Sequence, residues 1–238
     1  SPAMETEIRI DQAFFSDLER PASFYILRHG ETVANAESRI QGRSEYPLNE
    51  NGRAQAADLA RHLEGAGVRR LLYSPLSRAR ETAAIVAAAL GLDGSELAAE
   101  PALVELDTGR FSGLTLTEIR ERFPAEHEAF GYCSWEAVPD AERAEELYRR
   151  ASLAWSRLKA EAKASGGNVA AVSHGGMIQW LVRATFGCRS WMPLLSTGNC
   201  GVFELFVDPV GGGRPAYLQW KELNRLPGGT AGRTPPVF

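Results

Sequence analysis

The stretch FYILRHGETVANAESRIQG, residues 24–42, begins as an apolar run and then changes abruptly in character. Its first four residues, 24–27, are apolar or aromatic, which indicates a short buried strand. The run ends on Arg28-His29-Gly30, where two side chains that can carry positive charge stand in succession. Neighbouring cations gain nothing from an apolar core, so we expect either ordinary loop surface or a site that receives a negatively charged group.

Apolar runs and helical patterns alternate along the rest of the chain. The strands are recognised as short apolar runs bounded by turn residues, and the helices by apolar side chains that recur at i, i+3, i+4 and i+7. Such alternation indicates an α/β fold with a mainly parallel sheet covered by helices on both faces. The predicted strands are 24–27, 70–73, 168–172 and a hairpin of 201–207 with 216–220, and the predicted helices lie in 56–63, 78–90 and 144–158.

The domain organisation follows from length and from the absence of any linker pattern. A chain of 238 residues is long enough to bury one substantial core. We therefore expect a single domain at residues 23–225, preceded by an N-terminal extension at 1–22 and followed by a tail at 226–238 that is rich in Gly and Pro. Residues 1–3, Ser-Pro-Ala ahead of a methionine, resemble a remnant of cloning.

Composition excludes several classes of function. A net charge of −4 gives no overall basic field for nucleic acid or an acidic membrane surface. No apolar run approaches the about 20 residues of a membrane helix, and the N-terminus lacks a signal-peptide pattern. The three cysteines are scattered and form neither a disulfide framework nor a metal knuckle. We expect a cytoplasmic protein that binds neither nucleic acid nor a membrane.

Three predicted strands deliver cationic residues to one edge of the sheet. In a parallel sheet, ligands bind beyond the carboxyl ends of the strands. A phosphoryl group would supply the missing counter-charge there, because guanidinium groups match phosphate oxygens and glycine lets backbone N–H groups approach an anion. The residues that follow the three strand ends are Arg28-His29-Gly30, Ser74-Pro75-Leu76-Ser77-Arg78 and Ser173-His174-Gly175-Gly176.

These residue types can transfer a phosphoryl group in two steps. A histidine near two arginines stays neutral at pH 7, since the cations disfavour its protonation, and its ring nitrogen can then attack phosphorus. The departing alcohol needs a proton, which a carboxylic acid in the same pocket can supply. Glu105 and Asp107 are two positions apart and would share a face of an extended segment, so the residues alone leave both as candidates.

Four motifs together resemble the histidine phosphatase superfamily, in its phosphoglycerate mutase-like branch. Each motif alone is weak evidence, but their common order and their positions at predicted strand ends are specific. The resemblance covers roughly residues 23–207 and implies a three-layer α/β/α sandwich that uses no metal and no organic cofactor. The motifs are Arg28-His29-Gly30-Glu31-Thr32 with Asn35, SPLSRARETA at 74–83, Glu-x3-Gly-x3-Gly at 105, 109 and 113, and SHGG at 173–176.

The resemblance implies a role for each residue that matches the family's motifs. His29 corresponds to the nucleophile that becomes phosphorylated. Glu105, ahead of the two spaced glycines, corresponds to the general acid, which decides the choice against Asp107. The residues that correspond to the phosphate and substrate pocket are Arg28, Asn35, Gln41, Gly42, Arg78, His174 and Gly175.

Three functions fit this chemistry: a phosphatase acting on a small phosphate ester, a cofactor-dependent phosphoglycerate mutase, and an inactive phosphate-binding module. The last is disfavoured because every chemical position is present. Mutases of this family carry an arginine directly after the acid, where this chain has Leu106. They also have a long, more basic insertion, whereas here His174 follows Glu105 by only 69 positions and residues 136–146 are acidic. We therefore expect a phosphatase.

The stretch FGYCSWEAVPD, residues 130–140, falls where the family inserts a cover over its substrate. Tyr132 and Trp135 within it fit two interpretations equally well. They form either part of a pocket wall or ordinary loop packing.

Overall fold

The structure, a computed structural model, describes residues 7–229 and contains one six-stranded sheet in the order β3-β2-β4-β1-β5-β6. Neighbours among β1 to β4 run parallel, while β5 is antiparallel to β1 and β6 to β5. The predicted α/β class and the C-terminal hairpin are thus confirmed. The strands are β1 (Ala22–Arg28), β2 (Val68–Tyr73), β3 (Leu97–Ala99), β4 (Asn168–Ser173), β5 (Val202–Asp208) and β6 (Tyr217–Arg225).

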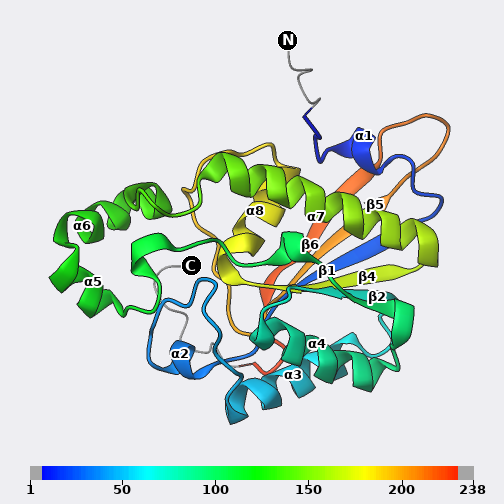
Figure 1. Cartoon of the computed structure of the whole chain (residues 1–238). Helices are drawn as coiled ribbons and strands as arrows, with labels where there is room; N and C mark the ends of the chain where they lie inside the picture. Colours follow the sequence, from blue (N-terminus) through cyan, green and yellow to red (C-terminus); the bar gives the residue numbers. More distant parts are fainter. Residues whose placement is uncertain (1–6, 230–238) are drawn as a thin grey trace.

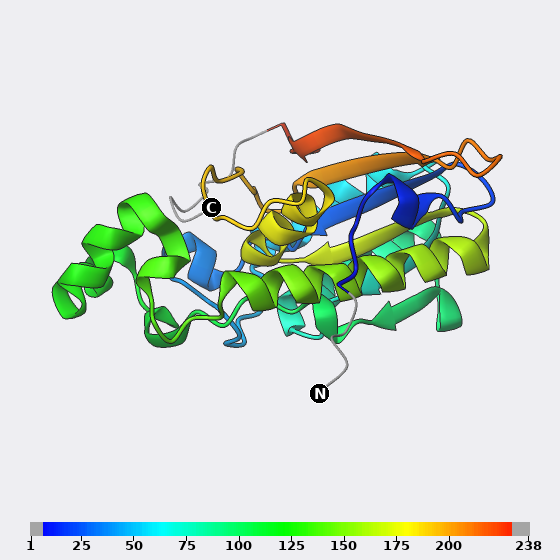
Figure 2. The same cartoon turned by 90° about the horizontal axis from the view of Figure 1, so that it is seen from above.

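Helices cover both faces of the sheet and complete a three-layer sandwich (Figures 1 and 2). Helices α3 and α4 contribute buried side chains to the core on one face, and α7 and α8 to the core on the other. Helices α5 and α6 form a lobe beyond the end of α7 (Figure 1). The helices are α1 (Gln12–Phe15), α2 (Val33–Ala36), α3 (Glu50–Leu63), α4 (Ser77–Leu90), α5 (Leu116–Arg122), α6 (Pro124–Cys133), α7 (Ala144–Ser165) and α8 (Gly175–Thr185).

Successive side chains of β1 point to opposite faces of the sheet, so they contribute to different cores. Phe24 and Ile26 point into the core under α7 and α8, whereas Leu27 belongs to the core under α3 and α4. Trp155 of α7 packs edge-on against Phe24 at 5.6 Å between ring centroids. Its indole Nε1 donates to the Leu181 carbonyl oxygen at 2.8 Å, so the ring is buried without an unpaired donor.

Several boundaries and elements depart from the expectations. Strand β3 and helices α1, α2, α5, α6 and α8 were not predicted. Residues 7–21 lie ahead of β1, yet Ile10 and Phe15 within them are buried in the core. Residues 1–6 and 230–238 lie outside the described part, and with them the cloning remnant and most of the tail at 226–238. No helix within 7–229 pairs the length of a membrane span with the apolar character it needs.

The turn after β1 rests directly on the start of α3, and glycines make this close approach feasible. A Cβ added at Gly30 would lie 2.5 Å from the Gly52 carbonyl oxygen, and one added at Gly52 would lie 2.1 Å from the Glu31 carbonyl oxygen. Both obstacles are backbone atoms, which cannot rotate away. The contact therefore fixes the turn that carries His29 against a helix.

Replacing Gly52 by alanine is expected to lower the free energy of unfolding by about 1–3 kcal/mol, because the new methyl group forces two backbone segments apart. Gly131→Ala is the matched control, since a Cβ at that position of α6 meets nothing within 4 Å. Urea unfolding of both variants measures the difference. Equal stability of the two variants would contradict the tight contact.

Candidate active site

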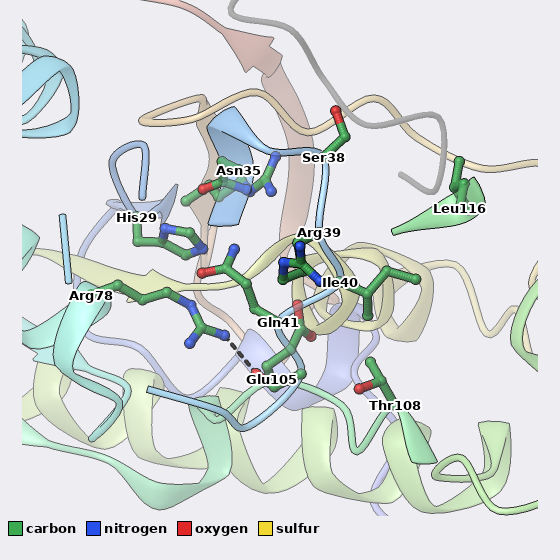
Figure 3. A pocket seen from close by; sticks show the side chains of 12 residues that line it. His29, Asn35, Ser38, Arg39, Ile40, Gln41, Arg78, Glu105, Thr108 and Leu116 are labelled. Atoms are coloured by element: carbon green, nitrogen blue, oxygen red, sulfur yellow. Dashed lines mark hydrogen bonds between the residues drawn. The ribbon is translucent and has the colours of Figure 1, made fainter. Parts of the chain in front are cut away.

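One pocket lies at the carboxyl end of β1 and beside the first turn of α4, the helix that follows β2 (Figure 3). It includes seven of the nine predicted site residues. The other two, His174 and Gly175, begin the segment after β4, and the His174 ring lies 5.2 Å from the His29 ring between centroids. The lining residues are Arg28, His29, Asn35, Ser38, Arg39, Ile40, Gln41, Gly42, Arg78, Glu105, Thr108 and Leu116.

His29 is buried at the end of β1 and faces the pocket (Figure 3). Its Nδ1 lies 2.7 Å from the Gly30 carbonyl oxygen. Because a carbonyl oxygen only accepts, Nδ1 carries the proton and the lone pair resides on Nε2. Burial, together with the charges of Arg78 and Arg28, lowers the pKa of His29 well below its usual range. The ring is therefore neutral at pH 7 and has the electronic form of a nucleophile.

Two buried arginines flank this histidine, each anchored by backbone carbonyls. Arg28 Nη1 donates to the Thr197 carbonyl oxygen. Arg78 Nη1 and Nη2 donate to the carbonyl oxygens of Ser44 and Gly42 at 2.8 and 2.6 Å. Burial lowers the pKa of both arginines to about 10, so both remain charged at neutral pH. The anchors hold two guanidinium groups in fixed positions at one pocket.

Three buried polar nitrogens at this site have no hydrogen-bond partner among residues 7–229: Arg28 Nε, Arg78 Nε and His174 Nδ1. Unpaired buried donors are rare and destabilising, so such a group calls for an explanation. Here two of the three belong to cations, and all three lie next to His29. The two arginine Nε atoms carry protons, and so does His174 Nδ1 when Nε2 accepts from Ser74 Oγ. In that tautomer, an anion with several acceptor oxygens would accept from all three.

His174 is held by a residue to which sequence reasoning assigned no role. Its Nε2 lies 2.7 Å from Ser74 Oγ, at the end of β2. Burial and then the neighbouring charge of Arg78 lower the pKa of His174 well below its usual range. Ser74 stands first in the SPLSRARETA motif, and that position was the available signal.

Glu105 lies at the amino end of α8. Its Oε1 accepts from the backbone N–H groups of Leu106 at 2.8 Å and Met177 at 3.0 Å, and its Oε2 accepts from Gly176 at 3.1 Å. Burial raises the pKa of this carboxyl above its usual range, even though these donors and two arginines favour its charged form. A raised pKa is what a proton donor working near neutral pH requires.

Asp107 lies in different surroundings. Among residues 7–229, Asp107 is not one of those that line the pocket, and its carboxylate accepts from the Gly109 N–H at 3.0 Å. It borders a separate surface hollow with Arg43 and Glu142. The geometry therefore favours Glu105 as the acid that faces a ligand in the pocket.

Amide side chains complete one wall of the pocket. Thr32 Oγ1 lies 2.8 Å from Gln41 Oε1 and 3.1 Å from Asn35 Oδ1, and Asn199 Nδ2 donates to the same Asn35 oxygen at 3.2 Å. Because both amide oxygens take part in this network, the NH2 groups of Asn35 and Gln41 remain as donors for a ligand. Thr197 and Asn199 were missed, although the polar run STGN before strand β5 was visible in the sequence.

The structure decides between the two interpretations for Trp135, whereas Tyr132 fits neither of them. Trp135 is fully buried and packs against Phe111 and Phe130, with ring centroids 5.8 and 5.0 Å away. Tyr132 is 71% exposed on α6. Neither residue is in the pocket lining found within 7–229. Trp135 therefore stabilises the lobe by ordinary packing.

The model of the histidine phosphatase superfamily (branch 1) matches residues 24–220. The chain belongs to this superfamily. The match extends over all four motifs and all six strands as far as the middle of β6. The resemblance drawn from the motifs is confirmed, and so is the phosphoglycerate mutase-like fold.

Relatives of this member of the histidine phosphatase superfamily carry names from two reactions. The probable phosphoglycerate mutase GpmB of Citrobacter koseri is 33% identical over 182 residues, which cover 75% of this chain and 81% of the relative. The phosphoglycerate mutase-like protein 4 of Arabidopsis thaliana is 34% identical over 189 residues, or 78% and 80% of the two chains. The structure of the mycobacterial glucosyl-3-phosphoglycerate phosphatase with VO3 is 27% identical, with a TM-score of 0.73 over 86% of this chain and 99% of that one.

Proposed function

We propose that the chain is a phosphatase that hydrolyses a small phosphate monoester through a covalent phosphohistidine on His29, with Glu105 as general acid and then general base. The observation that carries this proposal is the set of three unpartnered buried nitrogens beside His29, on Arg28, Arg78 and His174, within residues 7–229. The three equatorial oxygens of a transferring phosphoryl group would accept from them and bring the phosphorus next to the His29 ring.

The first step forms the phosphohistidine. The lone pair on His29 Nε2 attacks phosphorus, and the bond from phosphorus to the ester oxygen breaks. The proton of the Glu105 carboxyl passes to that oxygen, so a neutral alcohol departs. The proton stays on His29 Nδ1, which keeps donating it in a hydrogen bond to the Gly30 carbonyl oxygen, and the two arginines compensate the charge on the phosphoryl oxygens.

The second step returns the enzyme to its starting form. A water molecule enters on the side from which the alcohol departed, and the Glu105 carboxylate accepts its proton. The water oxygen bonds to phosphorus while the bond from phosphorus to Nε2 breaks. Inorganic phosphate departs, His29 is neutral again and Glu105 is protonated.

Two observations support hydrolysis over mutase activity. Leu106, in the position where mutases carry an arginine, is fully buried in the core and lies outside the pocket lining within 7–229. Arg39, a cation at the pocket rim, already pairs with Glu37 at 3.2 Å and Glu118 at 3.1 Å. Arg39 is therefore a poor partner for the carboxylate of a sugar acid.

The acidic segment at 136–146 contributes less to this argument than the sequence suggested. Glu142 pairs with Arg150 at 2.8 Å, and Asp140 pairs with Arg110 at 3.1 Å. These carboxylates are therefore compensated and do not present bare negative charge to the pocket.

Hydrolysis and isomerisation are separable in one experiment. Phosphate esters are expected to release inorganic phosphate with repeated turnover, while 3-phosphoglycerate with catalytic 2,3-bisphosphoglycerate yields little 2-phosphoglycerate. Chelators are expected to leave the rate unchanged, because arginines compensate the phosphoryl charge, and vanadate is expected to inhibit as a mimic of five-coordinate phosphorus. Isomerisation at about 10 per second or faster with negligible hydrolysis would favour the mutase instead.

A further inference from the structure

One carboxylate and two arginines form a cluster behind the segment that carries Glu105. The Glu142 side chain is only 9% exposed. Its Oε1 accepts from Arg150 Nη2 at 2.8 Å and from Arg43 Nη2 at 3.3 Å, and its Oε2 accepts from Arg150 Nε at 3.1 Å. Glu142 therefore fixes the orientation of both guanidinium groups, and the two-point contact with Arg150 is the strongest form of such a pair.

Each member of this cluster also holds the backbone of the acid-bearing segment. Arg150 Nη1 donates to the carbonyl oxygens of Ala102, at 3.0 Å, and Val104. Arg43 Nε donates to the carbonyl oxygen of Glu105 itself at 3.1 Å.

Glu142 grips the segment directly on the other side of the acid. Its Oε1 accepts from the Asp107 N–H at 3.2 Å, and its own N–H donates to the Asp107 carbonyl oxygen at 2.8 Å. Backbone groups before, at and after Glu105 are thus held by one small set of charges.

The cluster has a rigid base and a link to the phosphate side of the pocket. Arg150 lies within the 22-residue helix α7, and Glu142 precedes its first residue by two positions. Arg43 directly follows Gly42, whose carbonyl oxygen accepts from Arg78 at 2.6 Å. The loop that anchors one phosphate-facing arginine therefore also reaches the backbone of Glu105.

We propose that Glu142 is a positioning residue for the general acid, acting through Arg43 and Arg150. Without its charge, the two arginines lose the partner that orients them, and their hold on residues 102–107 loosens. The carboxyl of Glu105 then shifts within the pocket, and a displacement of about 1 Å is enough to lower a rate about a hundredfold. This inference rests on the proposed function, because a positioned acid matters only if Glu105 donates a proton.

Glu142→Gln tests the proposal, since it keeps the shape and removes the charge. Turnover of an alkyl phosphate is expected to fall about tenfold to a hundredfold. Turnover of a nitrophenyl phosphate is expected to fall no more than about threefold, because its leaving group departs without a proton. The pH dependence with the alkyl ester should change as well, while KM changes little.

A carboxylate within α7 provides the matched control. Glu161 pairs with Arg70 at 3.1 Å and Arg157 at 3.6 Å, and within residues 7–229 none of these three forms a hydrogen bond with the 102–107 segment. Glu161→Gln is expected to leave both esters at wild-type rates. If Glu142→Gln fails to fold, Arg43→Gln replaces it, because Arg43 is 45% exposed and should show the same selective loss to a smaller extent.

A double-mutant cycle with Glu105→Gln separates positioning from general damage. If Glu142 acts through Glu105, adding Glu142→Gln to Glu105→Gln causes no further loss on the alkyl ester. Losses that multiply, or equal losses on both esters, would overturn the proposal. So would an unchanged rate and pH profile. In those cases wild type still shows turnover that depends on His29 and Glu105, whereas failure of the proposed function removes that turnover itself.

Discussion

Replacing His29 by alanine is expected to lower phosphate release by about four to six orders of magnitude, the loss typical of removing an enzyme nucleophile. The reason is that the imidazole with its lone pair on Nε2 is lost, while the charges that hold the phosphoryl group remain. His174 is a poor substitute, because its Nε2 already lies 2.7 Å from Ser74 Oγ. Phosphate release from a nitrophenyl ester and from an alkyl ester measures the effect.

The matched control is another histidine, His62, which lies in α3 outside the pocket lining within 7–229. His62→Ala is expected to retain wild-type turnover. Circular dichroism and thermal unfolding of His29→Ala should show that the variant is folded, so that the loss reflects chemistry. A folded His29→Ala variant within tenfold of the wild-type rate would eliminate His29 as the nucleophile.

Glu105→Gln is expected to slow esters with poor leaving groups far more than esters with good leaving groups. Turnover of an alkyl phosphate is expected to fall about 10²- to 10⁴-fold, because the alkoxide then leaves without a proton. A nitrophenyl phosphate should lose far less. Asp107→Asn is the control, since this carboxylate caps the Gly109 N–H outside the pocket, and it should affect both esters little.

The pH profile gives the same assignment a second test. The pKa of His29 is lowered, so its neutral form persists as pH falls through the usual histidine range, and the acidic limb should lie below about pH 6.5. The pKa of Glu105 is raised above its usual range, so the protonated carboxyl persists to higher pH than in an ordinary glutamate. This form is lost as pH rises through the raised pKa. For an alkyl ester, Glu105→Gln should therefore abolish the fall at high pH. A leaving-group effect that follows Asp107→Asn instead would transfer the proton donor to Asp107.

The cationic residues of the site were predictable, because the parallel order of the strands determines where they lie. Arg28 is the last residue of β1, His29 and His174 directly follow β1 and β4, and Arg78 lies in the first turn of the helix after β2. A parallel sheet brings such residues to one edge whatever the loops do. The residues alone did not decide between Glu105 and Asp107. The surroundings of Glu105 come from a contact with the amino end of α8, which no local sequence pattern reveals.

Two of the missed elements, α8 and β3, show no clear hydrophobic periodicity. Helix α8 is buried at nearly every position from Gly175 to Ala184, so it shows no polar face to mark it as a helix. Strand β3 is only three residues long at the sheet edge. Thr197 and Asn199 reach the site from an irregular loop. Such a loop has no periodic pattern from which the inward-pointing side chains could be predicted.

The most direct test of the account is to trap the phosphoenzyme. Wild-type protein is mixed with a radiolabelled phosphate ester, quenched within the first turnover and digested, and the labelled peptide is identified by mass spectrometry. We expect a phosphoryl group on His29 that is labile in acid and stable in base, and that is absent from His29→Ala. Label on another residue, an acid-stable phosphoester, or steady turnover with no labelled protein at any time would contradict it.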